Sequence, residues 1–341
     1  MKNFHNFINK VIFRRGNLLL YLFLLFGILA RINSKFYFID LISQLGFQII
    51  IGGIILFFVF LIQKKLISSY ICIFVCVLLI IDISLSCSQC NALLKNKTDN
   101  NNEIRLMTFN TGLSNDFKNI KKLILSEMPE VVQLQEVSPE LQNNLKTLES
   151  VFPYNTGLDK PLEHFASVVL SKHPLKDIKI LDNYAVMAKV IYKKKEINII
   201  GIHLTTPLNP FLLDFYGDLY FKYSESTKPK SLPRLGYNFS VKQMNYLKKL
   251  IPDNNDDLII IGDLNMTSTS KRFTTFLDDT DLHTYVSYKN PTFTWPTFLP
   301  SYLGIQIDHV LFSKNFSVIK KKTTKHFGSD HRPLIVDLAF N

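Results

Sequence analysis

The chain has 341 residues, with 39 basic and 28 acidic side chains and a net charge of +11. Residues 1–90 carry eight bases and two acids, so six of the eleven excess charges lie in the most apolar part of the chain. The remaining five are a mild bias and do not indicate a dedicated nucleic-acid-binding protein.

The first 90 residues contain three apolar stretches: Asn17 to Ala30, Leu45 to Gln63 and Leu66 to Ser86. A membrane-spanning helix needs about 20 largely apolar residues. We therefore expect about three transmembrane helices in residues 1–90, and the lipid bilayer as a partner. The alternative is a helical hairpin with one additional helix buried in a protein core.

Basic pairs at positions 14–15 and 64–65 flank these stretches. Such bases accumulate on the cytoplasmic side, so three spans would place the C-terminal part outside the cytoplasm. Arg31 and Lys35 argue against this orientation, because they lie in the loop assigned to the outer side. We predict a multi-pass protein of the cell (inner) membrane with an extracytoplasmic domain.

All four cysteines, Cys72, Cys76, Cys87 and Cys90, precede residue 91, which excludes a disulfide framework in the rest of the chain. Cys87 and Cys90 have C-x-x-C spacing without a second pair or a nearby histidine, so no metal site is expected. They form either a local disulfide or two inert thiols.

Residues 91–103 are polar and aperiodic and are typical of a linker. From residue 104 onward, short apolar strands alternate with amphipathic helices, a pattern that indicates an α/β or α+β domain over 104–341. Strands are predicted at 104–109, 131–134, 185–192, 197–202, 258–261, 306–312 and 334–338, with helices near 117–128 and 241–250 and a hairpin turn at 193–196.

A polar residue able to bind metal or phosphate follows most of these strands. Taken singly, each has a simpler interpretation as a turn residue or a surface acid. Polar groups at the ends of neighbouring strands converge in space, which is how α/β folds build sites. The motifs are Asn110, Gln135-Glu136 in Gln-x-Gln-Glu, His203, Gly-Asp263-x-Asn265, Asp308-His309 and Ser-Asp330-His331.

In this order the motifs resemble the endonuclease/exonuclease/phosphatase superfamily, the DNase I-like enzymes, over nearly all of residues 104–341. The resemblance implies a four-layer α/β/β/α sandwich and hydrolysis of phosphate esters with Mg²⁺ or Mn²⁺. It implies metal ligands at Glu136, Asn110 and Asp330, and catalytic roles for Asp263, Asn265, His203, Asp308 and His331.

The implied roles have a physical basis. Glu136 supplies a hard carboxylate oxygen for the metal. Asp263 positions or deprotonates the attacking water, Asn265 donates to phosphoryl oxygens, and His203 contacts a nonbridging oxygen. Asp308 holds His331 in one tautomer at the scissile phosphate. Whether Asp263 or His331 is the base stays open, and His309 is interpreted as structural.

Two departures from the family's nucleases reduce the expectation of a nuclease. Many abasic-site enzymes carry an acid where this chain has Gly112, and a basic DNA-gripping insertion is not evident. Three spans before such a domain, together with Phe293-Thr-Trp-Pro296, resemble the membrane-anchored VanJ-like subgroup. That resemblance implies a phosphorylated amphiphile, such as polyprenyl pyrophosphate, as substrate.

Residues 207–235 are rich in aromatic side chains and end in bases, which fits either a membrane interface or an apolar loop packed on the domain. The first possibility favours a lipid phosphate as substrate, and no obligate protein partner is evident. An extracytoplasmic metal-dependent nuclease, with nucleic acid as partner, is the alternative. A catalytically silent membrane protein is disfavoured, because every motif residue is present.

Overall fold

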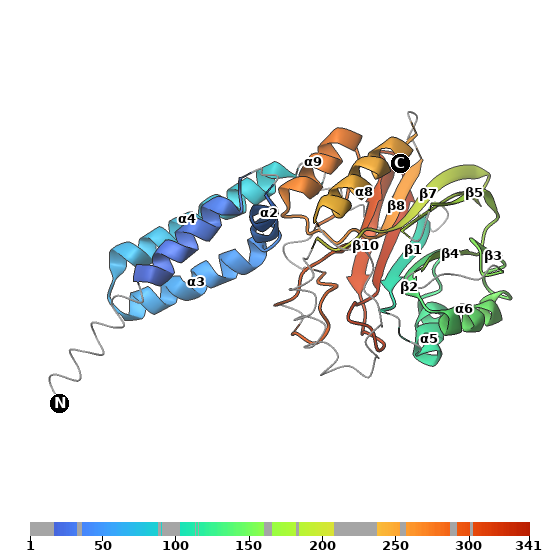
Figure 1. Cartoon of the computed structure of the whole chain (residues 1–341), viewed down its shortest axis with the longest axis horizontal. Coiled ribbons are helices and arrows are strands. Elements are labelled where there is room, and N and C mark those ends of the chain that lie inside the picture. Colours follow the sequence, from blue (N-terminus) through green and yellow to red (C-terminus); the bar gives the residue numbers. More distant parts are fainter. Residues whose placement is uncertain are drawn as a thin grey trace. The chain divides into compact units, whose positions relative to one another are not determined.

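A computed structural model describes most of the chain (Figure 1). The described residues are 17–32, 36–87, 90, 103–112, 114, 116–159, 166–181, 184–207, 237–252, 257–286, 292–300 and 303–341. They form two compact units. One comprises residues 1–88 and 267–275, and the other comprises residues 89–266 and 276–341.

The N-terminal unit is helical. Its helices are α2 (Tyr37–Ser43), α3 (Gly46–Ile62) and α4 (Leu66–Ser86), preceded by a short apolar helix over Asn17–Leu29. Of the helices that the structure describes, α4 is the one long and apolar enough to span a bilayer by itself. α2 and α3 reach that length only as a pair, bent by 66°. One span of the predicted three is thus matched by a helix of full length, and the others stay predictions.

Helices of this unit pack closely where a small residue meets larger ones. A Cβ atom on Gly53 would lie 2.4 Å from the Cys76 sulfur and 2.5 Å from the Phe23 ring. Cys72 and Cys76 are free, buried thiols. Cys87 and Cys90 are disulfide-bonded, so the interpretation of this pair as inert thiols is wrong.

Polar contacts of the N-terminal unit gather around α2 and the end of α4. Arg31 forms an ion pair with Asp82. Residues 267–275 belong to this unit through buried hydrogen bonds: the Thr267 amide donates to Gln44 Oε1 (2.7 Å), and the Thr267 hydroxyl donates to the Gln44 carbonyl (2.9 Å). A buried polar group without a partner costs free energy, and these contacts satisfy several at once.

The second unit contains two mixed sheets. The six-stranded sheet has the order β10-β11-β1-β2-β4-β3, and the five-stranded sheet has the order β5-β6-β7-β8-β9. The strands of the first are β1 (Glu103–Asn110), β2 (Val131–Val137), β3 (Tyr154–Asn155), β4 (Ala166–Ser171), β10 (Phe316–Thr323) and β11 (Leu334–Phe340). Those of the second are β5 (Leu175–Leu181), β6 (Ala185–Tyr192), β7 (Lys195–His203), β8 (Leu258–Asp263) and β9 (Asp308–Phe312).

The two sheets pack face to face over one apolar core. Ile104, Leu106 and Val336 from the six-stranded sheet share this core with Ile259 and Ile261 from the other sheet. The spacing follows the strand period of two, which sends alternate side chains to opposite faces. The predicted pair of packed sheets is confirmed.

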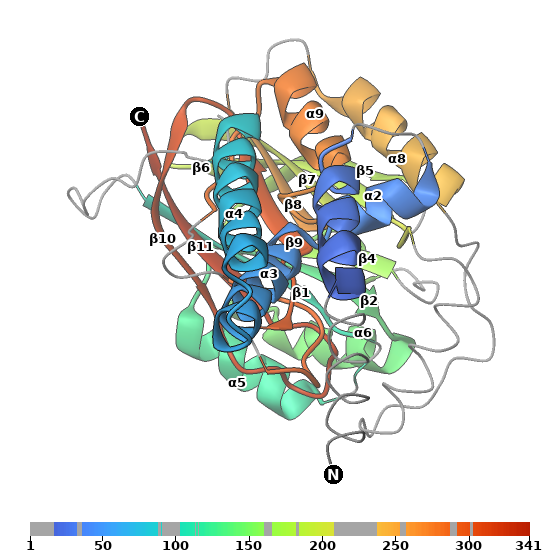
Figure 2. The same ribbon diagram turned by 90° about the vertical axis from the view of Figure 1, so that its left-hand side faces the viewer.

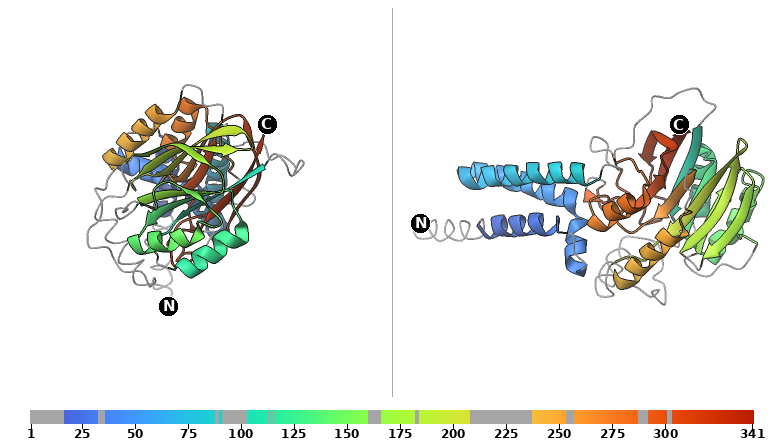
Figure 3. Two further views of the ribbon diagram at one scale, coloured as in Figure 1. Left: turned by 90° about the vertical axis from the view of Figure 1, so that its right-hand side faces the viewer. Right: turned by 90° about the horizontal axis from the view of Figure 1, so that it is seen from above.

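Helices cover the outer faces. α5 (Phe117–Glu127) and α6 (Pro139–Leu145) pack on the six-stranded sheet through a second core. Figures 2 and 3 show these two helices on the opposite side of the strands from α8 (Tyr237–Leu250). α9 (Lys271–Thr280) and a short 3₁₀ turn, Lys146–Leu148, complete the described helices.

Local sequence signals account for several of these boundaries. α5 begins after Asp116, whose carboxylate accepts a hydrogen bond from the Asn119 amide as an N-cap. It ends at Glu127, and the following residue, Met128, adopts a left-handed conformation (φ 46°) that caps the helix. The predicted hairpin turn is confirmed: Lys193 and Lys194 have φ of 48° and 69°, as a two-residue turn between twisted strands requires.

Candidate active site

Three neighbouring strands place their last or first residues side by side. In the ladders β7–β8 and β8–β9, His203 is opposite Asp263, and Asp263 is opposite Asp308. Directly opposed residues lie about 4.5–5.5 Å apart. The convergence predicted from the separate motifs is therefore produced by strand register in the five-stranded sheet.

Asn110, at the end of β1, connects the two sheets within the site. Its Nδ2 donates to Glu136 Oε1 (3.0 Å) and to Asp263 Oδ2 (3.1 Å), and its Oδ1 accepts from the Gly112 amide (3.0 Å). The Ser329 hydroxyl donates to the Asn110 carbonyl (2.7 Å). One amide thus holds two carboxylates at a fixed separation.

Glu136 lies near the end of β2 in a left-handed conformation (φ 52°), which is uncommon for a residue with a side chain. The Thr111 hydroxyl stabilises this turn by contacting the carbonyls of Gln135 (2.9 Å) and Glu136 (2.8 Å). Burial, and then the negative charge of Asp330, raise the pKa of Glu136 to about 7. The carboxylates of Glu136 and Asp330 therefore repel each other, and the charge of His331 offsets this repulsion only in part.

The Gly262-Asp263-Leu-Asn265 segment needs its glycine. Gly262 has φ 147°, and a Cβ atom there would lie 1.9 Å from the Ile202 carbonyl oxygen on β7. The Asn265 amide donates to Asp263 Oδ1 (2.8 Å). Its side-chain Nδ2 donates to the Leu204 carbonyl (2.7 Å) and to Asp263 Oδ2 (3.2 Å), so both side-chain N–H groups orient this loop. Burial, and then the charge of Asp308, raise the pKa of Asp263 well above its usual range.

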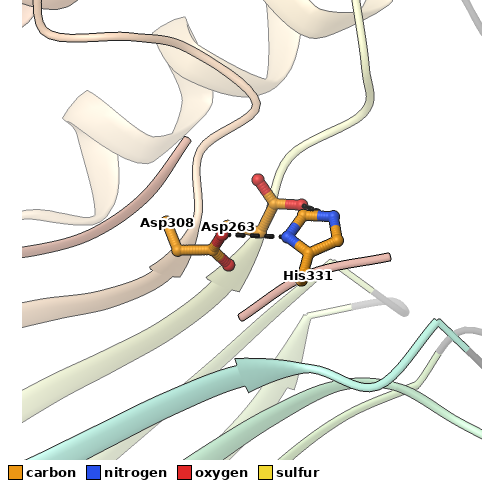
Figure 4. A group of neighbouring side chains, drawn as sticks. All are labelled: Asp263, Asp308 and His331. Carbon is orange, nitrogen blue, oxygen red and sulfur yellow. Dashed lines mark hydrogen bonds and ion pairs between the residues drawn. The ribbon is translucent and has the colours of Figure 1, made fainter. Parts of the chain in front are cut away.

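His331 and Asp308 form a buried ion pair (Figure 4). Asp308 Oδ2 is 2.9 Å from His331 Nδ1, and His331 Nε2 lies 3.8 Å from Asp263 Oδ2. Burial lowers the pKa of His331, but the carboxylates of Asp308, Asp330 and Asp263 outweigh it and raise that pKa to about 10. At neutral pH the imidazole is accordingly protonated.

His203 closes the opposite side of the site. Its Nε2 is 3.4 Å from Glu136 Oε1 and 3.8 Å from Asp263 Oδ2. Burial, and then the positive charge of His331, lower the pKa of His203 to about 4. The site therefore holds one charged and one neutral histidine at pH 7, each beside Asp263.

Asp330 is held by a residue whose role the motifs did not indicate. Trp295 Nε1 donates to Asp330 Oδ2 (3.0 Å). A Cβ atom on Gly112, whose φ is 56°, would lie 2.9 Å from Asp330 Oδ1. A side chain at Gly112 would therefore crowd Asp330 and strain a backbone conformation that favours glycine.

Two groups of side chains have the composition of a cation site. The carboxylates of Glu136 and Asp330 offer oxygen ligands, which suit Mg²⁺ or Mn²⁺. Asn110, the third predicted ligand, turns its Nδ2 donor toward Glu136, and its Oδ1 accepts from the Gly112 amide. Burial, and then repulsion from Asp330, raise the pKa of Glu136, and a bound cation would offset both effects, so these residues fit a divalent metal. Among the described residues, ligand atoms of Asp263, Asp308 and His331 also lie within 4.8 Å of one another.

All eight predicted site residues are described, and they meet at one end of the two sheets. Their individual roles stay predictions. The quoted motifs contain Thr294, Trp295 and Ser329, but their contacts with the site were not predicted: the Thr294 hydroxyl accepts from the Asp308 amide (3.3 Å), Trp295 binds Asp330 and Ser329 binds the Asn110 carbonyl. Most of the aromatic stretch at 207–235, and the linker up to residue 102, lie outside the described residues.

The profile of the "Endonuclease/Exonuclease/phosphatase family" matches residues 107–331, which includes every residue of this site. The chain belongs to the endonuclease/exonuclease/phosphatase family. It is a metal-dependent hydrolase acting on phosphate ester bonds, as predicted. No curated protein sequence matches the chain.

Three solved structures are similar to this chain. The 3′ phosphatase NExo from Neisseria, bound to a product DNA hairpin, has 14% identity and a TM-score of 0.50, covering 70% of this chain and 99% of its own. An endonuclease/exonuclease/phosphatase protein from Beutenbergia cavernae has 17% identity and a TM-score of 0.49, covering 70% and 72%. A humanised TDP2 from D. rerio has 15% identity and a TM-score of 0.49, covering 69% and 98%.

Proposed function

We propose that this protein is a membrane-anchored phosphoesterase that hydrolyses a lipid phosphate, such as polyprenyl pyrophosphate, on the extracytoplasmic side with Mg²⁺ or Mn²⁺. The observation that carries the proposal is the presence, in one chain, of the family's site and of α4, a helix of spanning length. An anchored site meets amphiphilic substrates that the bilayer concentrates. The VanJ-like motifs around Trp295 support the same substrate class.

In this proposal Glu136 and Asp330 would hold the metal, and Asn110, whose Nδ2 donates to Glu136 and Asp263, would position the carboxylates beside it. His331 is a weaker candidate ligand, because it is bound to Asp308 and protonated at neutral pH. When bound, the metal neutralises negative charge that develops on phosphoryl oxygens. Asn110 keeps the Glu136 and Asp263 carboxylates in place.

The protein's own groups supply the proton transfers. Asp263 has a raised pKa and lies between His203 and His331, so in this proposal its carboxylate accepts a proton from the attacking water. His331, protonated and held by Asp308, donates a hydrogen bond from Nε2 to a phosphoryl oxygen. Neutral His203 contacts a second, nonbridging oxygen. This assignment makes Asp263 the base and His331 the charge stabiliser.

A nuclease is the second candidate, because the similar Neisseria enzyme was crystallised with a product DNA hairpin. The two candidates differ in their dependence on salt. Nucleic-acid binding releases counterions and weakens steeply as salt rises. Capture of a substrate that is embedded in detergent or bilayer depends much less on salt.

The test is a side-by-side assay of the full-length protein in detergent with Mg²⁺. The substrates are polyprenyl pyrophosphate, sphingomyelin and plasmid DNA, each over a range of salt concentrations. We expect the lipid pyrophosphate to be cleaved fastest and to show the weakest salt dependence. Faster, salt-sensitive cleavage of DNA would favour the nuclease, and the absence of cleavage of any substrate would refute the proposed activity.

The proposed membrane orientation rests on charges at the two ends of α4. Lys64 and Lys65 precede this helix, and Asp82 lies 17 residues after Lys65, about 25 Å along the axis. This is close to the thickness of the bilayer core. Arg31 pairs with Asp82, so its charge is offset and no longer opposes a cytoplasmic location of Lys64 and Lys65. The Cys87–Cys90 disulfide fits an oxidising compartment.

The orientation predicts the behaviour of fusions at Asn341. With an odd number of spans, alkaline phosphatase fused at Asn341 should be active, and a fluorescent protein that matures only in the cytoplasm should be dark. A matched fusion after Lys65 should give the opposite pair of signals. A bright, phosphatase-negative fusion at Asn341 would contradict the extracytoplasmic location.

A further inference from the structure

His309 follows Asp308 on β9 and is fully buried, yet it has no assigned part in the reaction. Successive residues of a strand face opposite ways, so its ring points away from the Asp308–His331 pair. His309 Nε2 lies 2.8 Å from the carbonyl oxygen of Met266, one residue beyond Asn265. The imidazole therefore touches the loop that carries two of the candidate catalytic residues.

A chain of hydrogen bonds determines which nitrogen of His309 carries the proton. It begins at Lys321 on β10, whose ammonium or amine nitrogen lies 2.9 Å from Gln306 Oε1. The Thr292 hydroxyl donates to the same oxygen (2.7 Å). With Oε1 engaged by two donors, the Gln306 amide has one orientation, and its Nε2 faces the Asp308 carbonyl (3.1 Å) and His309 Nδ1 (3.3 Å).

The direction of each bond then follows from donor and acceptor chemistry. An amide nitrogen can donate and cannot accept, so His309 Nδ1 accepts and its proton resides on Nε2. Nε2–H donates to the Met266 carbonyl. Burial, and then the positive charge of Lys321, lower the pKa of His309 to about 3, which agrees with a neutral ring that has one proton to place.

The contact matters because the loop needs support on both sides of Asn265. Asn265 is in a left-handed conformation (φ 50°), which costs free energy unless the surroundings enforce it. On one side, the Leu264 amide donates to the Ile307 carbonyl (3.0 Å). On the other side, the Met266 carbonyl is held by His309. Ile307 and His309 are the two neighbours of Asp308 in the sequence. The two hydrogen bonds therefore fix the position of the loop relative to the strand whose Asp308 orients His331.

We propose that His309 is a positioning residue for phosphoester hydrolysis, holding the Asp263–Asn265 loop through its Nε2–H, with Lys321 and Gln306 fixing its tautomer. The role rests on the proposed function, because it acts on the reaction through Asp263. A residue that merely fills space could be replaced by any side chain of similar length without loss of activity. A residue that positions the loop through a hydrogen bond could be replaced only by a side chain that also has a donor.

A matched pair of substitutions separates these roles in the full-length protein in detergent. His309→Gln keeps a nitrogen donor near the position of Nε2, whereas His309→Met has similar length and no N–H donor. The activity probe is bis(p-nitrophenyl) phosphate with Mn²⁺, a small soluble phosphodiester independent of lipid. We expect His309→Gln to stay close to the wild type, and His309→Met to lose about 10- to 100-fold in kcat with little change in KM, as when supporting shells of active sites are altered.

Hydrogen exchange of the peptide that contains Leu264 to Thr267 gives a second readout that needs no turnover. We expect faster exchange in His309→Met than in the wild type, and near-wild-type exchange in His309→Gln. Equal effects of the two substitutions on kcat and on exchange would overturn the positioning role. If the wild type itself cleaves no phosphoester, the proposed function fails, and the exchange comparison still decides whether His309 holds the loop.

Discussion

Replacing Glu136 with Gln is expected to lower turnover by about 10³-fold or more, the scale observed when one essential electrostatic stabiliser is removed. The substitution keeps an oxygen that can accept from Asn110 Nδ2 and removes the negative charge. Folding should therefore be preserved while the metal loses its main carboxylate. Steady-state rates with saturating Mn²⁺, beside a circular dichroism spectrum of the variant, measure both effects.

The metal itself provides the control for this variant. EDTA should silence the wild type, and Mg²⁺ or Mn²⁺ should restore it, whereas neither treatment should alter the residual rate of Glu136→Gln. Full activity of the wild type in EDTA would contradict the metal-dependent reaction. A normal rate for Glu136→Gln would place the metal elsewhere in the site, for example at Asp263.

The same carboxyl makes the effect of the metal depend on pH. The pKa of Glu136 is raised to about 7 in the folded protein, so without metal its contribution to stability is fully present below pH 4.5 and lost as pH rises through 7. Metal binding requires the deprotonated form. The rise in melting temperature on adding Mn²⁺ should thus be small at pH 5.5 and larger at pH 8, and Glu136→Gln should abolish the difference.

Much of the fold is predictable from strands buried on both faces. Leu258–Asp263 begins with four apolar residues, and Leu334–Phe340 is apolar except for Asp337. Both strands are buried, and both were expected, over 258–261 and 334–338. Strands at the edges of the sheets have a weaker pattern of apolar residues in the sequence. β5 is largely exposed, and β10 ends in a run of lysines around a bulge, so neither had the alternation that identifies a strand.

The site was predictable as a set of residue types, because each follows an apolar strand. Its geometry was not, because it depends on long-range pairing. The register that places His203, Asp263 and Asp308 side by side joins segments up to about a hundred residues apart. The contact between Trp295 and Asp330 joins two loops, and the hydrogen bond between His309 and Met266 joins a strand to a loop. In both cases no periodicity in the sequence marks the loop residue as a partner.

Disrupting the Asp308–His331 pair is the second large effect we expect. Asp308→Asn should lower kcat by about 10²- to 10⁴-fold, in the range of a positioned acid–base group, with less change in KM. If the two residues act as a unit, the double variant with His331→Ala should be about as slow as the slower single variant. Losses that simply add in free energy would mean that they act separately.

The pH profile of Asp308→Asn then distinguishes the two roles that His331 could have. In the wild type the carboxylates keep the pKa of His331 at about 10, against the opposing effect of burial. Without the Asp308 charge that pKa falls, and the ring becomes neutral at a lower pH. If protonated His331 stabilises charge on the phosphoryl group, the rate of Asp308→Asn relative to the wild type should recover as the pH is lowered. A relative rate that falls instead would make neutral His331 the base, and Asp263 would then act by orienting the water.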